Sequence, residues 1–218
     1  MKIAILGGTG QQGPGLALRW AMAGEEVIIG SRSQERAEKM ASELNAELGG
    51  DARIRGVENP QAAEAAEIVV LTVPYTAHVT TLESVKAHVQ GKIFVDVSVP
   101  LDPENPRRMK MPPAGSATEE AQAFFGPATK VVAAFQTISA HSLRDPHHAI
   151  DCDVLVCGDD AEAKQTVMSL VAKMGLYSYD VGPAESARVV EGLTSILIRL
   201  NIRHKVKESG IRLTGQPR

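Results

Sequence analysis

The chain has 218 residues, of which 44% are hydrophobic and 22% charged, and its formal net charge at pH 7 is -3. This length and composition are typical of a globular protein with one full core and a smaller appended unit. The charge balance indicates no basic face for nucleic acid, and no apolar segment approaches the roughly 20 residues that span a bilayer. We therefore expect no nucleic-acid partner, no membrane contact and a cytoplasmic location. Cys152 and Cys157 are expected to be small buried residues, without a disulfide or a metal.

An apolar run at the start of the chain ends in four glycines within seven residues. Residues 2–6 indicate a buried strand, and Gly8, Gly10 and Gly13 then fit the pattern G-x-G-x-x-G. In this pattern one glycine makes a tight turn, one lets the backbone approach a pyrophosphate, and one lets the next helix pack on the strand. A helix expected over residues 13–23 would direct its free N–H groups toward the phosphates. The motif therefore predicts dinucleotide binding rather than a purely structural turn.

Strand and helix signals alternate through the first 135 residues, which predicts a parallel sheet covered by helices on both faces. Strands are expected over residues 2–6, 26–30, 53–56, 68–73, 93–97 and 130–135. Between them, helices are expected over residues 13–23, 33–48, 75–89 and 116–125, and a further one begins with Asn59 as its N-cap and Pro60 at its first position. Residues 98–115 carry five prolines, so we expect an irregular surface loop there.

The composition becomes polar and histidine-containing over residues 136–152, which are expected to link two units. Strands are expected over residues 153–158 and 176–181, with a helix between them that ends near Met174. A long helix over residues 186–206 has apolar residues at helical spacing, and its length suits a subunit interface.

The residues after the second expected strand select between NAD and NADP. An acidic side chain there, about 20 residues past the glycines, would bind both ribose hydroxyls of NAD. Here the segment is Gly30-Ser31-Arg32-Ser33, which has no carboxylate. Arg32 can pair with a 2′-phosphate and Ser31 can donate to it, while Arg36 lies one helical turn further on. We therefore expect NADP(H), in preference to the alternative that both arginines are only solvated charges.

In open parallel sheets the ligand lies beyond the carboxyl ends of the strands, so the residues after each strand form the site. These segments are Val73-Pro74-Tyr75, Ser98-Val99-Pro100 and Gln136-Thr137-Ile138-Ser139. None of them is a strong acid or base, so we expect no catalytic acid or base. Hydride transfer between two cofactor rings requires mainly close face-to-face positioning and needs no dedicated proton relay.

Other reactive side chains are weaker candidates. His78 either donates to the nicotinamide side of the site or is an exposed helix residue. His147 and His148 lack a partner at metal-ligand spacing, and Asp159 with Asp160 is most simply a helix cap. No tyrosine is followed four positions later by lysine, which disfavours the chemistry of short-chain dehydrogenases.

Several segments together resemble one known family over nearly the whole chain and in the same order. They are Leu6-Gly7-Gly8-Thr9-Gly10-x-x-Gly13, Gly15-Leu16-Ala17, Gly30-Ser31-Arg32, Val154-Leu155-Val156-Cys157-Gly158-Asp159-Asp160 and Val190-Glu191-x-Leu193-Thr194. This combination resembles the F420-dependent NADP oxidoreductases. The resemblance implies a homodimeric enzyme that passes a hydride between NADP(H) and the deazaflavin coenzyme F420.

The resemblance also implies roles for individual positions. Thr9, Gly10, Gln11 and Gln12 would contact the pyrophosphate and adenosine side, and Ser31, Arg32 and Arg36 would hold the 2′-phosphate. Val73, Pro74 and His78 match positions near the nicotinamide, Gln136, Thr137, Ile138 and Ser139 match the segment beside the deazaflavin, and the tail around Gly210 resembles one that closes over the site. Family members often carry histidine where this chain has Gln136, a departure at the expected deazaflavin contact.

The predicted fold class is α/β, a Rossmann-type doubly wound parallel sheet with a small C-terminal α/β extension that ends in a long helix. We divide the chain into an NADP-binding Rossmann domain over residues 1–150 and a small C-terminal domain over residues 151–218. Two other functions stay open. One is an NADPH-dependent reductase of a flavin, quinone or ferric chelate, and the other is a non-catalytic protein that senses NADPH.

Overall fold

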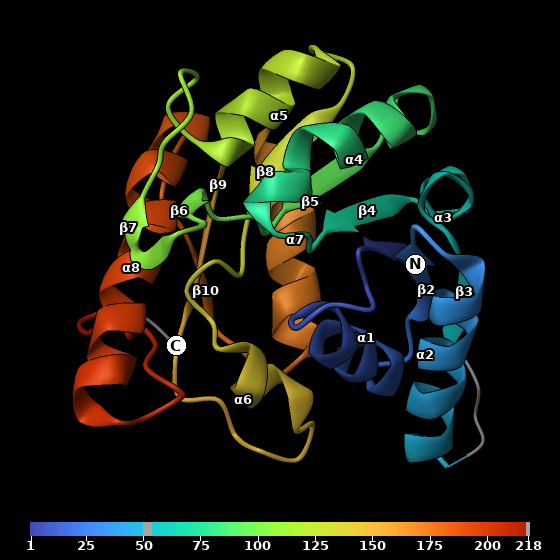
Figure 1. Cartoon of the computed structure of the whole chain (residues 1–218), viewed down its shortest axis with the longest axis horizontal. Coiled ribbons are helices and arrows are strands. Elements are labelled where there is room, and N and C mark those ends of the chain that lie inside the picture. The colour runs from blue at the N-terminus through green and yellow to red at the C-terminus, as the bar shows by residue number, and fades with distance from the viewer. Residues whose placement is uncertain (50–53, 217–218) are drawn as a thin grey trace.

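The computed structural model describes residues 1–49 and 54–216, and an eight-stranded sheet runs through it (Figure 1). The strands follow the order β10-β9-β8-β5-β4-β1-β2-β3 across the sheet. Their bounds are β1 Lys2–Leu6, β2 Glu26–Ser31, β3 Ile54–Glu58, β4 Ile68–Leu71, β5 Ile93–Asp96, β8 Lys130–Ala133, β9 Val154–Gly158 and β10 Ser178–Asp180. All neighbours pair in parallel except β8 and β9, which are antiparallel. The predicted Rossmann-type sheet is confirmed.

Helices cover both faces of the sheet. On one face α1 (Gly13–Met22), α2 (Gln34–Glu47) and α7 (Ala161–Lys173) close one buried apolar cluster, which contains Trp20. On the other face α3 (Asn59–Ala65), α4 (His78–Val85) and α5 (Ala117–Phe125) close a second cluster, which contains Phe94 and Phe125. In Figure 1, α4 and α5 lie along the top of the view and α1 lies below the sheet. This arrangement leaves the carboxyl ends of the parallel strands uncovered by helices.

Two local features differ from the sequence expectation at the third strand and its helix. The strand is Ile54–Glu58, and Arg53, where the expected strand begins, lies outside the described residues. The N-cap of α3 is Glu58, whose side chain forms a capping box with Gln61, so Asn59 lies inside the helix. Local propensity favours Asn at a cap, but here Asn59 Oδ1 accepts a hydrogen bond from Gly7 N at 3.3 Å, a contact between residues far apart in sequence.

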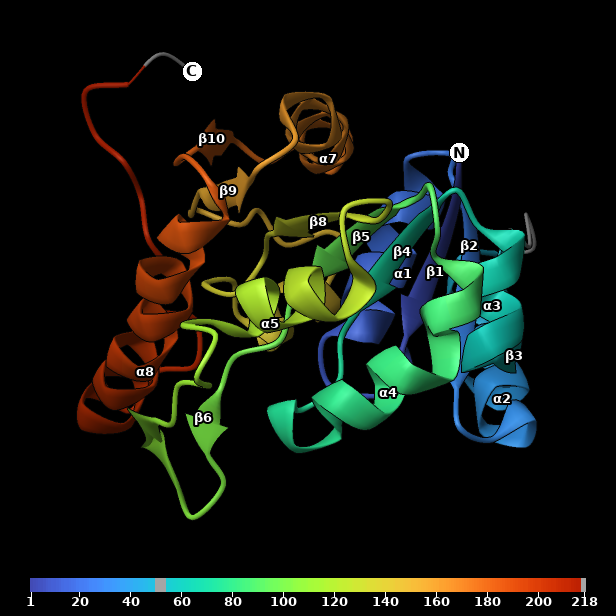
Figure 2. The same cartoon turned by 90° about the horizontal axis from the view of Figure 1, so that it is seen from above.

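Residues 98–115 do not form an irregular loop throughout. They contain a two-stranded antiparallel hairpin of β6 (Leu101–Asp102) and β7 (Asn105–Met109), which projects from the sheet beside α8 (Ala187–His204) in Figure 2. The prolines concealed this hairpin, because Pro106 lies in an edge strand, where its missing N–H is tolerated. Packing of β7 against α8 is a tertiary contact that local composition does not encode. The helix expected over residues 75–89 is likewise divided, into a 3-10 turn, α4 and a second 3-10 turn.

The segment expected to link two units is fixed firmly to the first helix. It contains a short helix, α6 (Ala140–Arg144), whose N-cap is Ser139. The buried guanidinium of Arg19, in α1, donates to the carbonyl oxygens of Ser142, Leu143, Asp145 and His148 at 2.6 to 3.0 Å. Four carbonyl acceptors satisfy this buried cation without a carboxylate in the same contact. The linking segment is therefore bound to the first part of the chain through α1.

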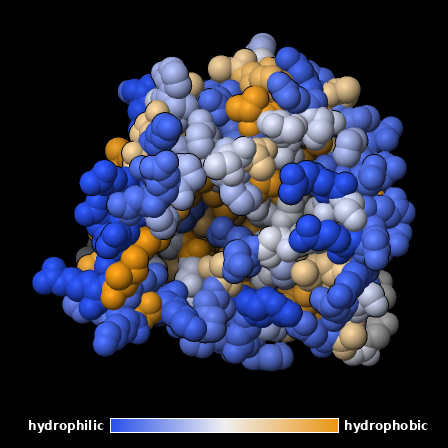
Figure 3. All heavy atoms as spheres, viewed as in Figure 1, coloured by the Kyte–Doolittle hydropathy of each residue, from blue (hydrophilic) through white to orange (hydrophobic). Residues whose placement is uncertain are grey.

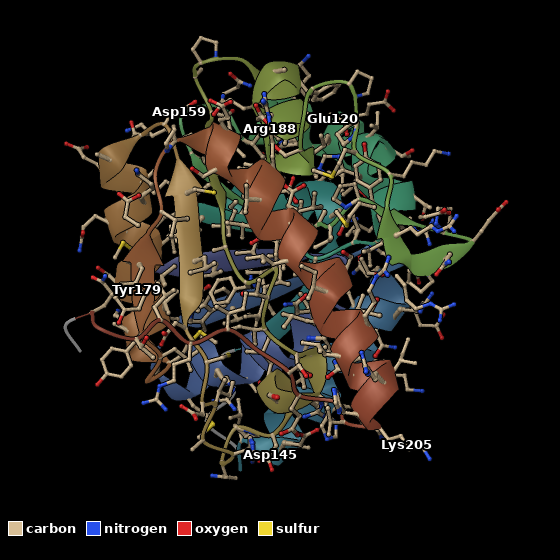
Figure 4. The ribbon with its side chains drawn as sticks, turned by 90° about the vertical axis from the view of Figure 1, so that its left-hand side faces the viewer. Glu120, Asp145, Asp159, Tyr179, Arg188 and Lys205 are labelled. Atoms are coloured by element: carbon tan, nitrogen blue, oxygen red, sulfur yellow. The ribbon has the colours of Figure 1, made fainter. Side chains whose placement is uncertain are left out.

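The C-terminal part continues the same sheet. Antiparallel pairing of β9 with β8 joins it to the first part, so the division near residue 150 stays a prediction about folding units. Cys152 and Cys157 are both buried, as expected, and burial raises the pKa of Cys157 to about 12. Figure 4 shows α8 crossing the outer face of the molecule, from Arg188 near one end to Lys205 at the other. Among the described residues, no helix is long and apolar enough to cross a membrane.

Candidate cofactor site at the strand ends

The glycine turn after β1 is closed by backbone contacts. Gly8 N donates to Gly30 O at 2.9 Å, and Gly7 has a φ of 69°, a conformation that favours glycine. A Cβ atom on Gly13 would lie 2.6 Å from Gly8 Cα, so α1 can approach the turn only because this position has no side chain. The glycine spacing therefore brings the N-terminus of α1 close to the end of β1, as the sequence predicts.

A pocket of about 630 Å³ lies over this turn and over the ends of neighbouring strands. Figure 3 shows the corresponding face hollowed near its centre, with apolar side chains inside the hollow. The pocket brings together these predicted residues: Thr9, Gly10, Gln11, Gln12, Ser31, Arg32, Arg36, Val73, Pro74, Ser98, Gln136 and Ile138. It is also lined by Tyr75 and Val99, which belong to the predicted strand-end segments. Its other lining residues were not predicted: Gly7, Ser33, Asn59, Thr72, Ala77, Thr81, Val97, Leu101 and Thr194.

Six predicted residues do not line this pocket. Gly8 and Gly13 form the turn beneath it, and His78 and Thr137 are buried. Ser139 caps α6 and donates to Lys207 O at 2.7 Å, and Gly210 packs against Cys152. The tail is thus fastened to α6 and to the start of β9 and does not lie over the pocket.

Exposed cations occupy the end of the pocket above β2. Arg32 and Arg36 are exposed, and neither has an ion pair within the part of the chain that the structure describes. Ser31 is buried, and its Oγ accepts from Ser33 N at 3.3 Å, which orders the start of α2. Two unpaired guanidinium groups beside a helix N-terminus form an anion site suited to a phosphate.

Below the middle of the pocket lies a buried charged cluster that the sequence analysis did not predict. His78, fully buried, contacts Asp96 Oδ2 through Nε2 at 2.7 Å and Glu120 Oε2 through Nδ1 at 3.0 Å. Tyr75 also donates to Glu120 Oε2, at 3.0 Å, and Ser98 N donates to Asp96 Oδ1 at 2.8 Å. Of the two alternatives for His78, the exposed helix residue is therefore wrong, and its contact with the nicotinamide side stays a prediction. Tyr75 and Ser98 line the pocket, so the buried cluster holds its wall from below.

Electrostatics in this cluster favour a charged histidine. Burial by itself lowers the pKa of His78, but the charges of Asp96 and Glu120 and their hydrogen bonds outweigh burial, and the pKa lies above its usual value. Burial also raises the pKa of Glu191, in α8, to about 7, although the N–H groups of Ala117 and Thr118 oppose this shift. The nearby charge of Asp96 acts in the same direction as burial. His78, Asp96 and Glu191, all buried, are thus interacting titratable side chains beneath the pocket.

Gln136 occupies the end of the pocket opposite the arginines of β2 and α2. Phe135, directly before it, has a φ of 72°, and its carbonyl accepts from Gln12 Nε2 at 2.9 Å. The Gln136 amide has one orientation, because its Nε2 donates to Asp96 O at 2.8 Å. Its Oε1 is buried and has no hydrogen-bond partner within the described chain. Buried polar atoms normally have a hydrogen-bond partner, so this acceptor in the pocket wall is suited to a donor group of a ligand.

The second side of this end comes from α8. Thr194 lines the pocket, and its Oγ1 donates to Gln136 O at 2.9 Å. Thr194 was part of the recognised motif but was not assigned to the site, because nothing local shows that a helix near the end of the chain returns to the first sheet. Asp160 does cap α7, as expected for this acidic pair, while Asp159 accepts from Ala184 N and so fixes the approach to α8.

The glycine turn, the anion site formed by Arg32 and Arg36, and the pocket at the strand ends define a Rossmann-class dinucleotide-binding protein. Residues 2–100 match the family described as NADP oxidoreductase coenzyme F420-dependent. A protein named F420-dependent NADP reductase from Methanothermobacter thermautotrophicus is 45% identical, over 100% of this chain and 96% of that protein. The chain therefore belongs to the family of F420-dependent NADP oxidoreductases.

Two further similarities place the chain among its relatives. The crystal structure of a candidate F420-dependent NADP reductase from Arthrobacter sp. FB24 superposes with a TM-score of 0.84 at 30% identity, and covers 98% of this chain and 99% of that one. The rat metalloreductase STEAP3 is 33% identical over 88% of this chain but only 36% of its own length. Similarity over both full lengths is thus found with the F420-dependent reductases.

Proposed function

We propose that this protein transfers a hydride reversibly between NADP(H) and coenzyme F420. The observation that carries the proposal is one pocket with two different ends. Arg32 and Arg36, which have no ion pair in the described chain, lie at one end, and Gln136 Oε1, a buried acceptor without a hydrogen bond, lies at the other. The full-length similarity to a named F420-dependent NADP reductase supports the same reaction. When both are bound, one ring supplies a hydride, with its two electrons, and the other accepts it.

The residues divide into two groups. The glycine turn with Thr9, Gly10, Gln11 and Gln12 would hold the pyrophosphate side of NADP(H), and Ser31, Arg32 and Arg36 its 2′-phosphate. Val73, Pro74 and Ser98 would form the floor beneath the nicotinamide, held by the Asp96 and His78 cluster. Gln136, Ile138 and Thr194 would position the deazaflavin, with Gln136 Oε1 accepting from a ring N–H. In this scheme the chain aligns two rings and excludes water, and no side chain is required as an acid or base.

The direct test is to mix the purified protein with NADPH and oxidised F420 and follow the deazaflavin absorbance. We expect bleaching that requires both protein and NADPH, and recovery of the absorbance when excess NADP⁺ is added. Absence of bleaching would overturn the proposal. A parallel series with a flavin, a quinone and a ferric chelate tests the alternative acceptors, for which the partial similarity to STEAP3 is the supporting observation. Tight NADPH binding without turnover of any acceptor would instead indicate an NADPH sensor.

We also propose that the protein acts as a homodimer in the cytoplasm, where both water-soluble cofactors are available. Support for the dimer comes from α8, where Val189, Leu193, Ile196 and Leu200 recur at alternating spacings of four and three residues. Val189 is 68% exposed and Ile196 52%, so this stripe is open to a second copy. Sedimentation should show a dimer that Ile196→Glu dissociates. Val79→Glu, at an exposed apolar residue outside the stripe, should leave it intact.

A further inference from the structure

A second hollow, distinct from the cofactor pocket, lies between β7 and α8. It has a volume of about 510 Å³ and is lined by Asn105, Arg107, Arg108, Arg199, Ile202 and Arg203. Four guanidinium groups thus converge on one hollow in a protein whose net charge is -3. Arginines gathered without a structural partner repel each other, so such a group indicates an anionic ligand.

These arginines differ from three other arginines on the surface, which are held in ion pairs. Arg144 pairs with Glu47, Arg188 with Glu119, and Arg212 with Asp151. By contrast, the four arginines of the hollow have no ion pair anywhere in residues 1–49 and 54–216. Their contacts are hydrogen bonds that fix geometry, from Arg199 Nε to Arg107 O at 3.0 Å and from Arg107 Nε to Asn105 Oδ1 at 3.2 Å. These bonds place the side chain of Arg199 beside Arg107, between the hairpin and α8.

The hairpin and α8, which form this hollow, also contribute residues to the cofactor pocket. Leu101 lines the cofactor pocket and pairs across the hairpin with Met109, the residue after Arg108. On the other side, Thr194 lines the cofactor pocket, and Arg199 follows it by about 7.5 Å along the axis of α8. Figure 2 shows the hairpin and α8 side by side, and each of them carries residues of both the cofactor pocket and the four-arginine hollow.

We propose that this four-arginine hollow binds the anionic tail of coenzyme F420. The tail extends from the deazaflavin ring through a ribityl phosphate to lactyl and γ-glutamyl groups, and so presents a phosphodiester and several carboxylates. Planar guanidinium groups bind both kinds of anion in a bidentate manner, and four of them attract a flexible polyanion from solution. The phosphates of NADP(H) are assigned to the glycine turn and Arg32, at the opposite end of the pocket. This inference rests on the proposed function and adds a site for the part of the coenzyme that does not react.

The test compares F420 with its tail-less fragment, the deazaflavin that ends at the ribityl alcohol. In the variant Arg108→Gln/Arg203→Gln, two positive charges are removed while Arg107 and Arg199, which carry the hydrogen bonds, are retained. We expect KM for F420 to rise at least tenfold, and its increase with added salt to become shallower. KM for the tail-less deazaflavin and for NADPH should change less than twofold. Arg144→Gln/Arg212→Gln removes the same charge from paired surface arginines and should leave all three KM values unchanged.

The outcomes separate the two proposals. If the wild-type protein reduces neither deazaflavin, the proposed function fails and the inference fails with it. If it reduces both with the same KM at low salt, or if the variant loses affinity for both to the same degree, only the inference is overturned. Fluorescence titration of F420 in the absence of NADPH provides a binding readout independent of turnover, and the same tenfold weakening is expected there.

Discussion

The two ends of the cofactor pocket are built in different ways. The NADP end comes from residues close together in sequence: the glycine turn, the end of β2 and the start of α2. The end proposed for the deazaflavin joins β8, α8 and the hairpin, and the buried cluster below the middle of the pocket connects α4, β5 and α5. The first end is a local motif that many sequences could carry. The second exists only when distant parts of the chain pack, so its removal should cost stability as well as binding.

The largest expected effect is therefore in the long-range end. His78→Leu removes the imidazole and both of its hydrogen bonds from the buried cluster, so that Asp96 Oδ2 and Glu120 Oε2 each lose a partner. An uncompensated buried charge costs about 3–5 kcal/mol of unfolding free energy. Denaturant titration of the variant should show this loss, together with a raised KM for the cofactors, because Ser98 and Tyr75 lose their support. His88→Leu, outside the cluster, should lose less than about 1 kcal/mol, and equal losses for the two variants would show that the cluster carries no special stability.

The next effect is a pH dependence from Glu191. Its folded-state pKa of about 7 lies above the ordinary glutamate value, so the folded protein binds the extra proton. The contribution of Glu191 to the free energy of unfolding is fully present below about pH 4.5 and is lost as the pH rises through about 7. This contribution is about 3 kcal/mol at most. His78, whose pKa is also raised, loses its contribution as the pH rises through its folded-state pKa, in the same direction. Urea midpoints at pH 5, 6, 7 and 8 should fall for the wild type and more shallowly for Glu191→Gln, while Glu185→Gln, at an exposed carboxylate, should follow the wild type.

At the local end, Gly13→Ala should act mainly through geometry. The added Cβ would lie 2.6 Å from Gly8 Cα, so the turn and the start of α1 must separate. Overpacking of this kind costs about 1–3 kcal/mol of stability, and NADPH affinity should fall because the helix N-terminus moves from the phosphates. Gly192→Ala is the matched control, since a Cβ there meets no atom within 4 Å in α8. Calorimetry that shows unchanged NADPH binding in the Gly13 variant would contradict the role of the turn.

How far the sequence predicts the molecule follows the same division. The central strands and the helices that begin near Ser33 and Ser116 are local features, and they are found as predicted, with these two serines as the N-caps of α2 and α5. The buried cluster was missed because Asp96 is the last residue of an apolar strand and His78 looks like a helix surface residue until α5 brings Glu120 against it. The hairpin at Pro106 and the return of Thr194 to the pocket depend on packing against α8, which no local pattern reports.

Arg32→Gln should give an effect of similar size that is confined to one cofactor. Loss of a charge-assisted contact to a 2′-phosphate costs about 1.5–3 kcal/mol, which corresponds to roughly 10- to 100-fold in NADPH affinity. NADH lacks that phosphate, so its affinity should hardly change and the preference for NADPH should largely disappear. Arg55→Gln, at an arginine on β3 that does not line the cofactor pocket, serves as the charge control. Equal weakening of NADPH and NADH would show that Arg32 does not select the phosphate.

The smallest effect is expected at Gln136, where one acceptor is at stake. Gln136→Leu removes Oε1 and the bond from Nε2 to Asp96 O, and a single net hydrogen bond contributes about 1 kcal/mol, or about fivefold. KM for F420 should rise by about this factor and KM for NADPH should not. A rise in KM for NADPH without a rise in KM for F420 would place the Oε1 acceptor against the nicotinamide. Gln136 would then belong to the NADP end of the pocket. The Asp96 carbonyl accepts from Gln136 and the Asp96 carboxylate accepts from Ser98, so Asp96 connects the residue proposed for the deazaflavin with a residue proposed for the nicotinamide.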